Sequence, residues 1–151
     1  MKGSIDIVGR ADLGELAGLM RLYCDFYEVA PSDDSLAALI GALLDEPAQG
    51  LQLIARGDDG TAVGFATVYW TWSTLSTARI GVMNDLYVIE PRRGEGWADR
   101  LIDACAEQCR QRGVKSLSWQ TALDNERAQA VYARVGATPE RWLDWSLEVT
   151  P

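Results

Sequence analysis

The spacing of apolar residues divides this chain into alternating strands and helices. Apolar residues recur every three or four positions in segments that predict amphipathic helices. These segments are 13–23, 36–44, 98–109 and 126–135. Runs that are rich in β-branched and aromatic residues, or that alternate strictly, predict strands. These are 5–8, 51–55, 63–72, 80–89, 116–121 and 142–149. The order predicts a mixed α/β sheet, and a chain of 151 residues without linker or repeat predicts a single domain, 1–151.

A glycine-rich loop, residues 93–96, lies between the strand at 80–89 and the helix that follows. Glycines let the backbone approach a ligand closely, and the first-turn N–H groups and the dipole of a helix attract negative charge. A pyrophosphate is therefore the expected ligand. The loop lacks a Gly-Lys-Ser/Thr triplet, which excludes a nucleoside-triphosphate loop. Asp99 stands where a dinucleotide loop needs its last glycine.

The run Arg93-Gly94-Glu95-Gly96-Trp97-Ala98 fits the pattern Arg/Gln-x-x-Gly-x-Gly/Ala and resembles the acetyl-CoA loop of the GNAT N-acetyltransferase superfamily. The block 85–88 before the loop and the block 121–137 after the next helix are also similar to that family, in the same order. The resemblance covers roughly 63–149. It implies an α/β fold with a mixed, mostly antiparallel central sheet and helices on both faces.

The resemblance implies that acetyl-CoA is the cosubstrate and that its acetyl group passes to a primary amine. It places acetyl-CoA against the end of the central strand, the loop and a later helix. The residues concerned are Leu86, Tyr87, Val88, Arg93, Gly94, Glu95, Gly96, Trp97, Ala98, Asn125 and Tyr132. It assigns the backbone N–H of Val88 to the acetyl carbonyl oxygen and the Tyr132 hydroxyl to the departing thiolate. Asn125 and Tyr132 are seven positions apart, which puts both on one helix face. A Tyr132 that only packs between helix and sheet is the alternative.

The group that accepts the proton of the attacking amine has several candidates. In some related polyamine acetyltransferases a glutamate stands at the position of Asn84, which is an amide here. Asp85 is the adjacent carboxylate, and strand parity sends it to the face opposite Asn84, Leu86 and Val88. Either Asp85 accepts the proton directly or a water chain does, and a purely structural Asp85 is the alternative. The chain has no histidine, so acid–base chemistry needs carboxylates, tyrosine, lysine, thiol or water.

An aromatic and acidic cluster at the joint of the first two helices matches the place where the family forms much of its acceptor pocket. We expect Tyr27 and Glu28 from this cluster, together with Trp72 and Asn84, to contact the acceptor. Aromatic faces and carboxylates together bind an ammonium group. As an alternative, Tyr23 and its aromatic neighbours are core residues, and a core position is favoured for the tryptophan rings of the strand at 63–72.

The distribution of charge favours a small cationic acceptor over nucleic acid. The net charge is −8, which disfavours a polyanionic partner. Residues 1–50 carry three basic and nine acidic groups, so −6 of that charge lies in the first third. This part of the chain either attracts a cationic amine or simply keeps the protein soluble.

Other features of the sequence bear on the cellular compartment, on metal binding and on the oligomeric state. No apolar run approaches about 20 residues, and the first residues lack an apolar signal region, so we expect a cytoplasmic protein without a membrane partner. Three cysteines then predict reduced thiols. Cys105 and Cys109 lie one helical turn apart without a histidine partner, which favours core packing over a metal site. Members of the family often dimerise, so a homodimer is a further expectation.

The loop also departs from the family pattern. Trp97 places a large ring where the family usually has a small aliphatic residue, and Glu95 and Asp99 bring carboxylates to an anion site. Arginines at 92, 93 and 100 offset them in number. Two alternatives to a small-amine N-acetyltransferase therefore stay open: acetylation of a protein or peptide amine, and a degenerate, non-catalytic acyl-CoA-binding module.

Overall fold

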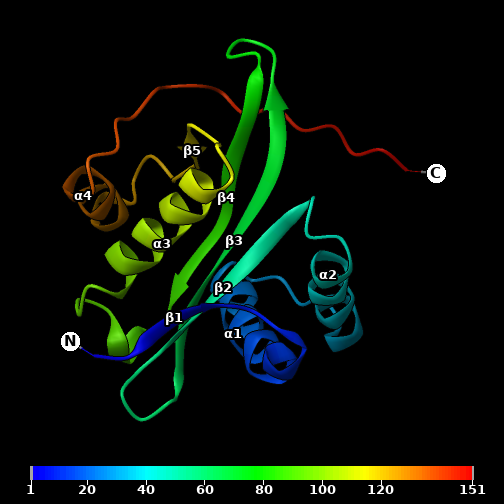
Figure 1. Ribbon diagram of the computed structural model, residues 1–151, viewed down its shortest axis with the longest axis vertical. Coiled ribbons are helices and arrows are strands. Elements are labelled where there is room, and N and C mark those ends of the chain that lie inside the picture. Colours follow the sequence, from blue (N-terminus) through cyan, green and yellow to red (C-terminus); the bar gives the residue numbers. More distant parts are fainter. Residues whose placement is uncertain (1, 151) are drawn as a thin grey trace.

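Five strands form one mixed sheet in the computed structural model, which describes residues 2–150 (Figure 1). The strands lie in the order β1 (Ser4–Ile7), β2 (Gly50–Arg56), β3 (Ala62–Ser73), β4 (Ala78–Val88) and β5 (Leu117–Ser118). Neighbours from β1 to β4 are antiparallel, and β4 and β5 are parallel. A parallel pair needs a crossover connection, which the helix between β4 and β5 supplies. The predicted mixed, mostly antiparallel sheet is confirmed.

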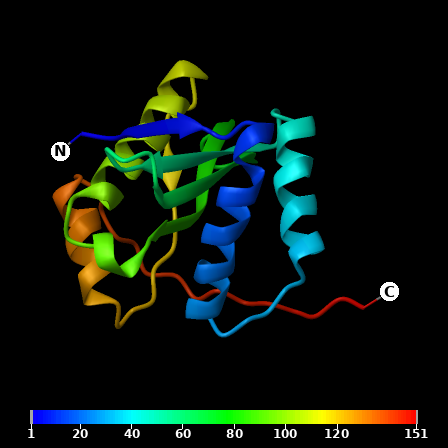
Figure 2. The same cartoon turned by 90° about the horizontal axis from the view of Figure 1, so that it is seen from below.

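Helices cover both faces of the sheet, as predicted (Figures 1 and 2). The helices α1 (Leu13–Phe26) and α2 (Asp33–Asp45) lie on one face, and α3 (Trp97–Gln111) lies on the other. The last helix, α4 (Glu126–Arg134), lies beside α3. Two short 3-10 turns, Arg10–Asp12 and Glu90–Arg92, precede α1 and the glycine loop. Each face has its own apolar core, one beneath α3 and one beneath α1 and α2.

The helix boundaries follow from local chemistry. The hydroxyl of Ser32 caps α2 by accepting a hydrogen bond from the backbone N–H of Ser35 (3.1 Å), and Asp33 and Asp34 lie in the first turn. At the start of α1, Glu15 pairs with Arg56 at 2.8 Å. Gly113 follows the end of α3 and has a left-handed φ of +67°.

A β-bulge interrupts β4 at Asn84. Asp85 lies opposite Thr67 and Met83 lies opposite Val68, so Asn84 has no residue opposite it on β3. The extra residue changes the parity of the strand. Met83 therefore packs on the α3 side together with Leu86 and Val88. Asp85 faces the α1 side, as the predicted parity requires relative to Leu86 and Val88.

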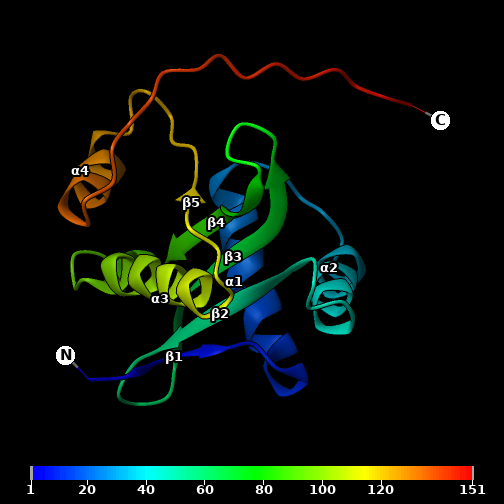
Figure 3. The same ribbon diagram turned by 45° about the horizontal axis from the view of Figure 1, so that its top comes forward.

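The predicted strands at the C-terminal end are only partly formed. The strand expected at 116–121 is limited to Leu117–Ser118, and the strand expected at 142–149 is absent among the described residues. The chain after α4 instead runs as an extended segment outside the layers (Figures 1 and 3). The reason is that alternating residues form a strand only where another strand offers an edge. That edge is missing along this segment.

The tryptophans of β3 have different surroundings. Trp70 is buried, as expected, but Trp72 is 69% exposed, because the β3–β4 hairpin projects beyond the helices (Figure 1). Cys105 and Cys109 are buried in the core under α3, as predicted, and all three thiols are free. Within residues 2–150, no helix combines the length and apolar character that crossing a bilayer requires.

Candidate active site

The glycine loop presents backbone N–H groups at the start of α3. Gly94 and Gly96 have left-handed φ values of +82° and +83°, and no atom lies within 4 Å of the position that a Gly94 Cβ would take. Arg100 is the first residue whose N–H reaches back into the helix, to the carbonyl of Gly96 (3.2 Å). The preceding N–H groups, of Trp97, Ala98 and Asp99, have no acceptor within the helix. This arrangement suits a pyrophosphate.

The two carboxylates near the loop are both neutralised by arginines. Glu95 accepts from Arg92 Nε (2.7 Å) and from Trp97 Nε1 (3.1 Å). The hydrogen bond from Arg92 lowers the pKa of Glu95. Asp99 forms two hydrogen bonds with Arg134 of α4, at 2.8 and 2.9 Å. The acidic residues that depart from the family pattern therefore do not face the anion site as unpaired charges.

The ring of Trp97 lies in the core and not in the loop. Trp97 is 1% exposed, the Arg100 guanidinium lies 4.4 Å from its ring centroid, and the ring packs against Gly3 of the N-terminal segment. The indole is thus closed to a ligand. Only the main chain of Trp97 is left to contact acetyl-CoA, which narrows the predicted role of this residue.

The edge of β4 that faces β5 is unpaired beyond Val82. The ladder between the two strands joins Gly81 with Leu117 and Val82 with Ser118. On the other side, the N–H of Ile89 donates to Val63 (2.9 Å), so by alternation the N–H and C=O of Val88 turn away from β3. The Val88 N–H, predicted to meet the acetyl carbonyl, therefore points to the side where β5 has ended.

Arg93 lies beside this edge rather than over the loop. Its Nε donates to the carbonyl of Val88 (2.9 Å). Its guanidinium lies 5.6 Å from the ring centroid of Tyr87 and 5.8 Å from that of Phe26. Arg93 thus links the end of β4 to the end of α1.

Asp85 is a buried carboxylate on the α1 side of the sheet. It is 8% exposed and accepts a hydrogen bond from Asn84 Nδ2 (3.0 Å). The side chain of Tyr23, from α1, lies beside the Asp85 carboxylate. Burial and the charge of Asp85 raise the pKa of Tyr23 above its ordinary value, so Tyr23 stays a neutral donor. Burial and the same charge also raise the pKa of Tyr69.

Tyr23, beside this carboxylate, is the centre of an aromatic cluster. The ring of Tyr23 lies 5.8 Å from Phe65 and 6.1 Å from Tyr87, both in edge-on geometry. Tyr27, the predicted acceptor contact, is exposed, and its ring lies 5.0 Å from Tyr23. Sequence reasoning named Tyr23 as an aromatic candidate but missed its position beside Asp85, because only tertiary packing brings α1 to β4.

Glu28 and Trp72 lie outside this cluster. Glu28 follows the end of α1, is exposed and has a φ of +58°. Trp72 lies opposite Arg79, five residues along β3 from Thr67, the partner of Asp85. At about 3.3 Å per residue this separates Trp72 from Asp85 by about 16 Å. The Arg79 guanidinium lies 5.5 Å from its ring. The structure thus brings Asn84 to Asp85, places Tyr27 against Tyr23, and leaves Trp72 on the hairpin.

The two predicted residues of α4 lie at its start and near its end. Asn125 caps the helix, because its Oδ1 accepts from the N–H of Ala128 (3.1 Å). Tyr132 is half-buried against the core under α3, and its ring meets Trp119 edge-on at 5.2 Å. Trp119 directly follows β5. Tyr132 therefore lies on the α3 side of the sheet, next to the end of β5.

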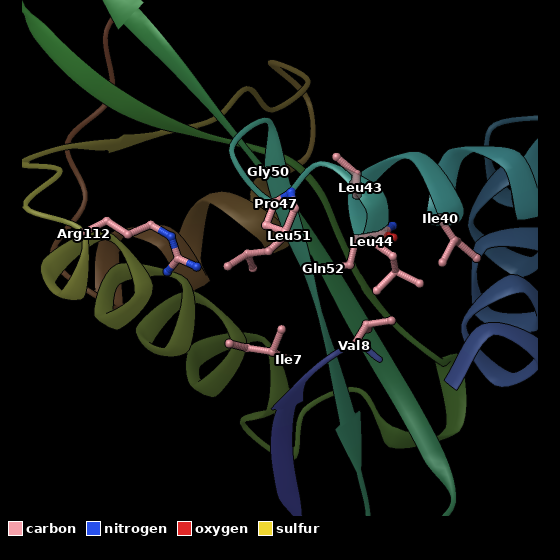
Figure 4. A pocket seen from close by; sticks show the side chains of 10 residues that line it. All are labelled: Ile7, Val8, Ile40, Leu43, Leu44, Pro47, Gly50, Leu51, Gln52 and Arg112. Carbon is pink, nitrogen blue, oxygen red and sulfur yellow. The ribbon is translucent and has the colours of Figure 1, made fainter. Parts of the chain in front are cut away.

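A hollow of about 110 Å³ lies between α2 and the strands β1 and β2 (Figure 4). Its lining is mainly aliphatic and consists of Ile7, Val8, Ile40, Leu43, Leu44, Pro47, Gly50, Leu51, Gln52 and Arg112. None of the predicted site residues is among them. Across the part of the chain that the structure describes, no three histidine, cysteine, aspartate or glutamate side chains gather as a metal site.

Comparison with known proteins identifies the family. The profile of the acetyltransferase (GNAT) family matches residues 16–137. An uncharacterised N-acetyltransferase of Bacillus subtilis, YhfO, is 33% identical over 126 residues, which cover 83% of each chain. Aminoglycoside N(6')-acetyltransferase type 1 of Serratia marcescens is 31% identical over 86 residues, 55% of this chain and 59% of that enzyme. The chain belongs to the GNAT family.

Solved structures show the same fold. The crystal structure of a probable acetyltransferase superposes with a TM-score of 0.86 at 26% identity, covering 98% of this chain and 99% of that one. The structure of AAC(6')-Iy in complex with the bisubstrate analogue CoA-S-monomethyl-acetylneamine also superposes with a TM-score of 0.86, at 20% identity, covering 99% of this chain and 100% of that one. The protein is an acetyl-CoA-dependent N-acetyltransferase.

Proposed function

We propose that this N-acetyltransferase transfers the acetyl group of acetyl-CoA to a primary amine of a small cationic acceptor. The observation that carries the proposal is the buried Asp85 carboxylate, which accepts a hydrogen bond from Asn84 and lies beside Tyr23, a member of an aromatic cluster. A carboxylate among aromatic faces favours an ammonium group over a neutral or anionic one. The acidic first third of the chain and its similarity to aminoglycoside acetyltransferases support the same class of acceptor.

Acetyl-CoA would lie between the free edge of β4 and the start of α3. The loop and first turn, residues 94–98, would bind the pyrophosphate through backbone N–H groups. Leu86, Tyr87 and Val88 would line the strand side, and Asn125 and Tyr132 the α4 side. The pairing of Glu95 with Arg92 and of Asp99 with Arg134 supports retained binding, since neither carboxylate opposes the anion unpaired.

When bound, acetyl-CoA supplies an acetyl thioester that an amine can attack. The amine needs to lose a proton, and Asp85 accepts it directly or through water. The N–H of Val88 donates to the carbonyl oxygen as negative charge develops there. The Tyr132 hydroxyl gives a proton to the departing sulfur. An amide and a free thiol result. The nitrogen of an ammonium loses two protons on the way to the amide: one leaves through Asp85 to solvent, and the other restores the proton that Tyr132 gives to the sulfur.

We also propose a domain organisation, a compartment and an assembly state for the enzyme. We propose one domain over 1–151, since β-strands and helices pack on one sheet. Three free thiols suit a reducing compartment such as the cytoplasm. A homodimer is also proposed.

An acceptor panel with thiol release as readout tests the proposal. A polyamine and an aminoglycoside should react faster than a neutral amine, an anionic amine or a peptide, with rates that fall as salt rises. Asp85→Asn should lower the rate with cationic amines about 10²- to 10⁴-fold. Asp34→Asn, which removes the same charge from an exposed position in α2, is the control and should react like the parent.

Three outcomes would overturn the proposal. Preference for an anionic amine would exclude an acidic acceptor pocket. Preference for the peptide would favour the protein-acetylating alternative. A melting temperature unmoved by acetyl-CoA, without thiol release, would favour a degenerate module.

A further inference from the structure

A row of three buried polar residues crosses the sheet beneath α1. Gln52 of β2 lies opposite Thr67 of β3, and Thr67 lies opposite Asp85 of β4. The three residues are 3%, 0% and 8% exposed. Apart from tryptophan and cysteine, no other residue with a polar side chain is buried in the part of the chain that the structure describes. Because a buried polar group costs free energy unless it is hydrogen-bonded, three of them in one row indicate a function.

The whole row lies on the face of the sheet that α1 covers. Gln52 Nε2 lies 3.7 Å from the sulfur of Met20, which belongs to the core beneath α1 and α2. Phe65 and Tyr87, two positions along β3 and β4 from the other two members, pack in the same core. Residues directly opposite each other on antiparallel strands have their Cβ atoms about 4.5–5.5 Å apart. The row therefore leads from the α1 core to the Asp85 carboxylate.

The side-chain amide of Gln52 gives the row a direction. A methionine sulfur can only accept a hydrogen bond, so the part of the amide that faces Met20 is the NH₂ group. The same Nε2 lies 3.1 Å from Thr67 Oγ1 and donates there as well. Since the oxygen of Thr67 accepts from Gln52, the hydroxyl keeps its own proton to donate elsewhere. The next member of the row is Asp85, whose ionised carboxylate can only accept.

We propose that Thr67 is a positioning residue for Asp85, with its hydroxyl proton turned toward the carboxylate, and that Gln52 holds the hydroxyl in this orientation. Asn84 Nδ2 already donates to Asp85 at 3.0 Å, and the hydroxyl adds a second donor dipole. Donors that favour the charged form let a buried carboxylate stay ionised. The proposal rests on the proposed function, because it gives the row the task of keeping a proton acceptor ionised. Thr67 and Gln52 are too deeply buried to touch substrate, so both act through Asp85.

The other titratable groups around Asp85 keep their charge over the pH range of the test. Burial and, after it, the charge of Asp85 raise the pKa values of Tyr23 from α1 and Tyr69 from β3, so both stay neutral below pH 10. On β4, Tyr87 lies on the same face, and the guanidinium of Arg93 lies 5.6 Å from its ring. An arginine stays protonated throughout. A titration of this cluster in mildly acidic solution therefore reports the carboxylate.

Carboxyl ¹³C NMR of the protein without substrate follows this titration, with Asp85→Asn to identify the resonance. Thr67→Val keeps the shape of the side chain and removes the hydroxyl. The Asp85 carboxyl should then titrate about 1–2 pH units higher than in the parent, the shift that one hydrogen bond to a charged group produces. Thr67→Ser restores the hydroxyl and should return the titration to that of the parent. Thr71→Val, at an exposed position of the same strand, is the matched control and should leave the titration unchanged.

A second variant covers the case that Thr67→Val does not fold, since valine leaves the Gln52 amide without its acceptor. Gln52→Leu combined with Thr67→Val replaces both partners by apolar side chains, which buried sites tolerate better than one lost partner. It should give the same upward shift. Gln52→Leu alone should shift the titration in the same direction but less, because the hydroxyl stays and loses only its fixed orientation. A titration that none of these variants moves would overturn the proposal.

The pH dependence of acetyl transfer shows whether the row serves catalysis. Asp85 accepts a proton only when it is ionised, so Thr67→Val should move the acid limb of kcat/KM for the amine upward by the same 1–2 pH units, as estimated above from one hydrogen bond. The KM of acetyl-CoA should stay unchanged. An equal loss of kcat/KM at every pH, with a raised KM of acetyl-CoA, would mean a merely structural row and overturn the proposal.

Two combinations of results separate this inference from the proposed function. If Thr67→Val shifts the NMR titration while Asp85→Asn reacts like the parent, the row positions the carboxylate and the proposed proton acceptor is wrong. If Asp85→Asn is impaired and no variant of the row moves the titration, the proton acceptor stands and only the inference about Thr67 and Gln52 is wrong.

Discussion

Arg134 and Asp99 form a two-point ion pair that joins α4 to the first turn of α3. Arg134 Nε lies 2.9 Å from Asp99 Oδ2, and Arg134 Nη2 lies 2.8 Å from Asp99 Oδ1. Asp99 belongs to the same turn whose backbone N–H groups would receive a pyrophosphate. The pair therefore has two effects, which variants can separate: it neutralises a carboxylate beside the anion site, and it positions the helix that carries Tyr132.

Removing the arginine should weaken acetyl-CoA binding more than removing the aspartate. Arg134→Met leaves Asp99 unpaired, so we expect the dissociation constant of acetyl-CoA to rise about three- to tenfold at low salt. Asp99→Asn removes the carboxylate itself and should leave the constant unchanged or lower it. Calorimetry on both variants decides. Equal weakening in both would show that the pair acts only by positioning α4.

A methyl group at Gly94 should act on acetyl-CoA binding as well as on stability. Gly94 and Gly60 have φ values of +82° and +80°, and neither has an atom within 4 Å of its missing Cβ. Gly94→Ala and Gly60→Ala should each cost about 1–2 kcal/mol in the unfolding free energy, because both force alanine into the left-handed region. Only Gly94→Ala should raise the dissociation constant of acetyl-CoA, at least tenfold. A similar loss of affinity in both variants would argue against the loop as the pyrophosphate site.

The hydroxyl of Tyr132 should matter for rate and not for binding. Loss of a positioned general acid lowers the rate about 10²- to 10⁴-fold. Tyr132→Phe keeps the ring that packs against Trp119, so the fold and the affinity for acetyl-CoA should stay near those of the parent. Steady-state kinetics of the folded variant give the answer. A kcat close to the parent value would leave Tyr132 a packing residue.

The buried thiol of Cys105 should make the fold less stable at alkaline pH. Burial raises the pKa of Cys105 from an ordinary 9.0 to about 12. Above pH 9 the unfolded chain loses this proton while the native protein keeps it, so stability falls as pH rises, by about 1.4 kcal/mol per pH unit from this thiol. Burial also raises the pKa of Cys109, which adds to the slope.

Urea unfolding at pH 8, 9 and 10, in the presence of a reductant, measures this slope. Cys105→Ala should reduce it, although Cys109 keeps part of it. Cys24→Ala, at a half-buried position on α1, is the matched control and should retain the slope of the parent. An unchanged slope in Cys105→Ala would contradict the assignment.

The sequence predicted well those helices and strands in which the spacing of apolar residues reflects how the element packs in the fold. The helices and the strands of residues 5–89 appear at the expected places because one face of each is apolar and faces a layer of the same chain. Alternation at 142–149 is typical of a half-buried strand too, but a strand also needs a neighbouring strand to pair with. None lies along this segment among the described residues, so the predicted strand does not form although its pattern is clear.

Single residues of the site were harder to predict than the motif. The loop 93–98 could be recognised because its glycines and the helix start are adjacent in sequence. Trp70 and Trp72 point to the same face of β3. Only the tertiary structure shows that β3 extends beyond the helices at Trp72, which leaves this ring exposed. Tyr23 and Asp85 lie side by side although they are more than sixty positions apart in the sequence, and no local pattern encodes this proximity.

The bulge at Asn84 has a consequence for how this enzyme could have arisen. Because Met83 and Leu86 face the same core across one extra residue, deleting Asn84 would restore regular alternation without turning any other side chain of β4 to the wrong face. Neither core would need repacking. A single inserted codon therefore suffices to convert an ordinary strand into one that is kinked beside Asp85, and lineages of this fold can gain or lose that kink in one genetic step.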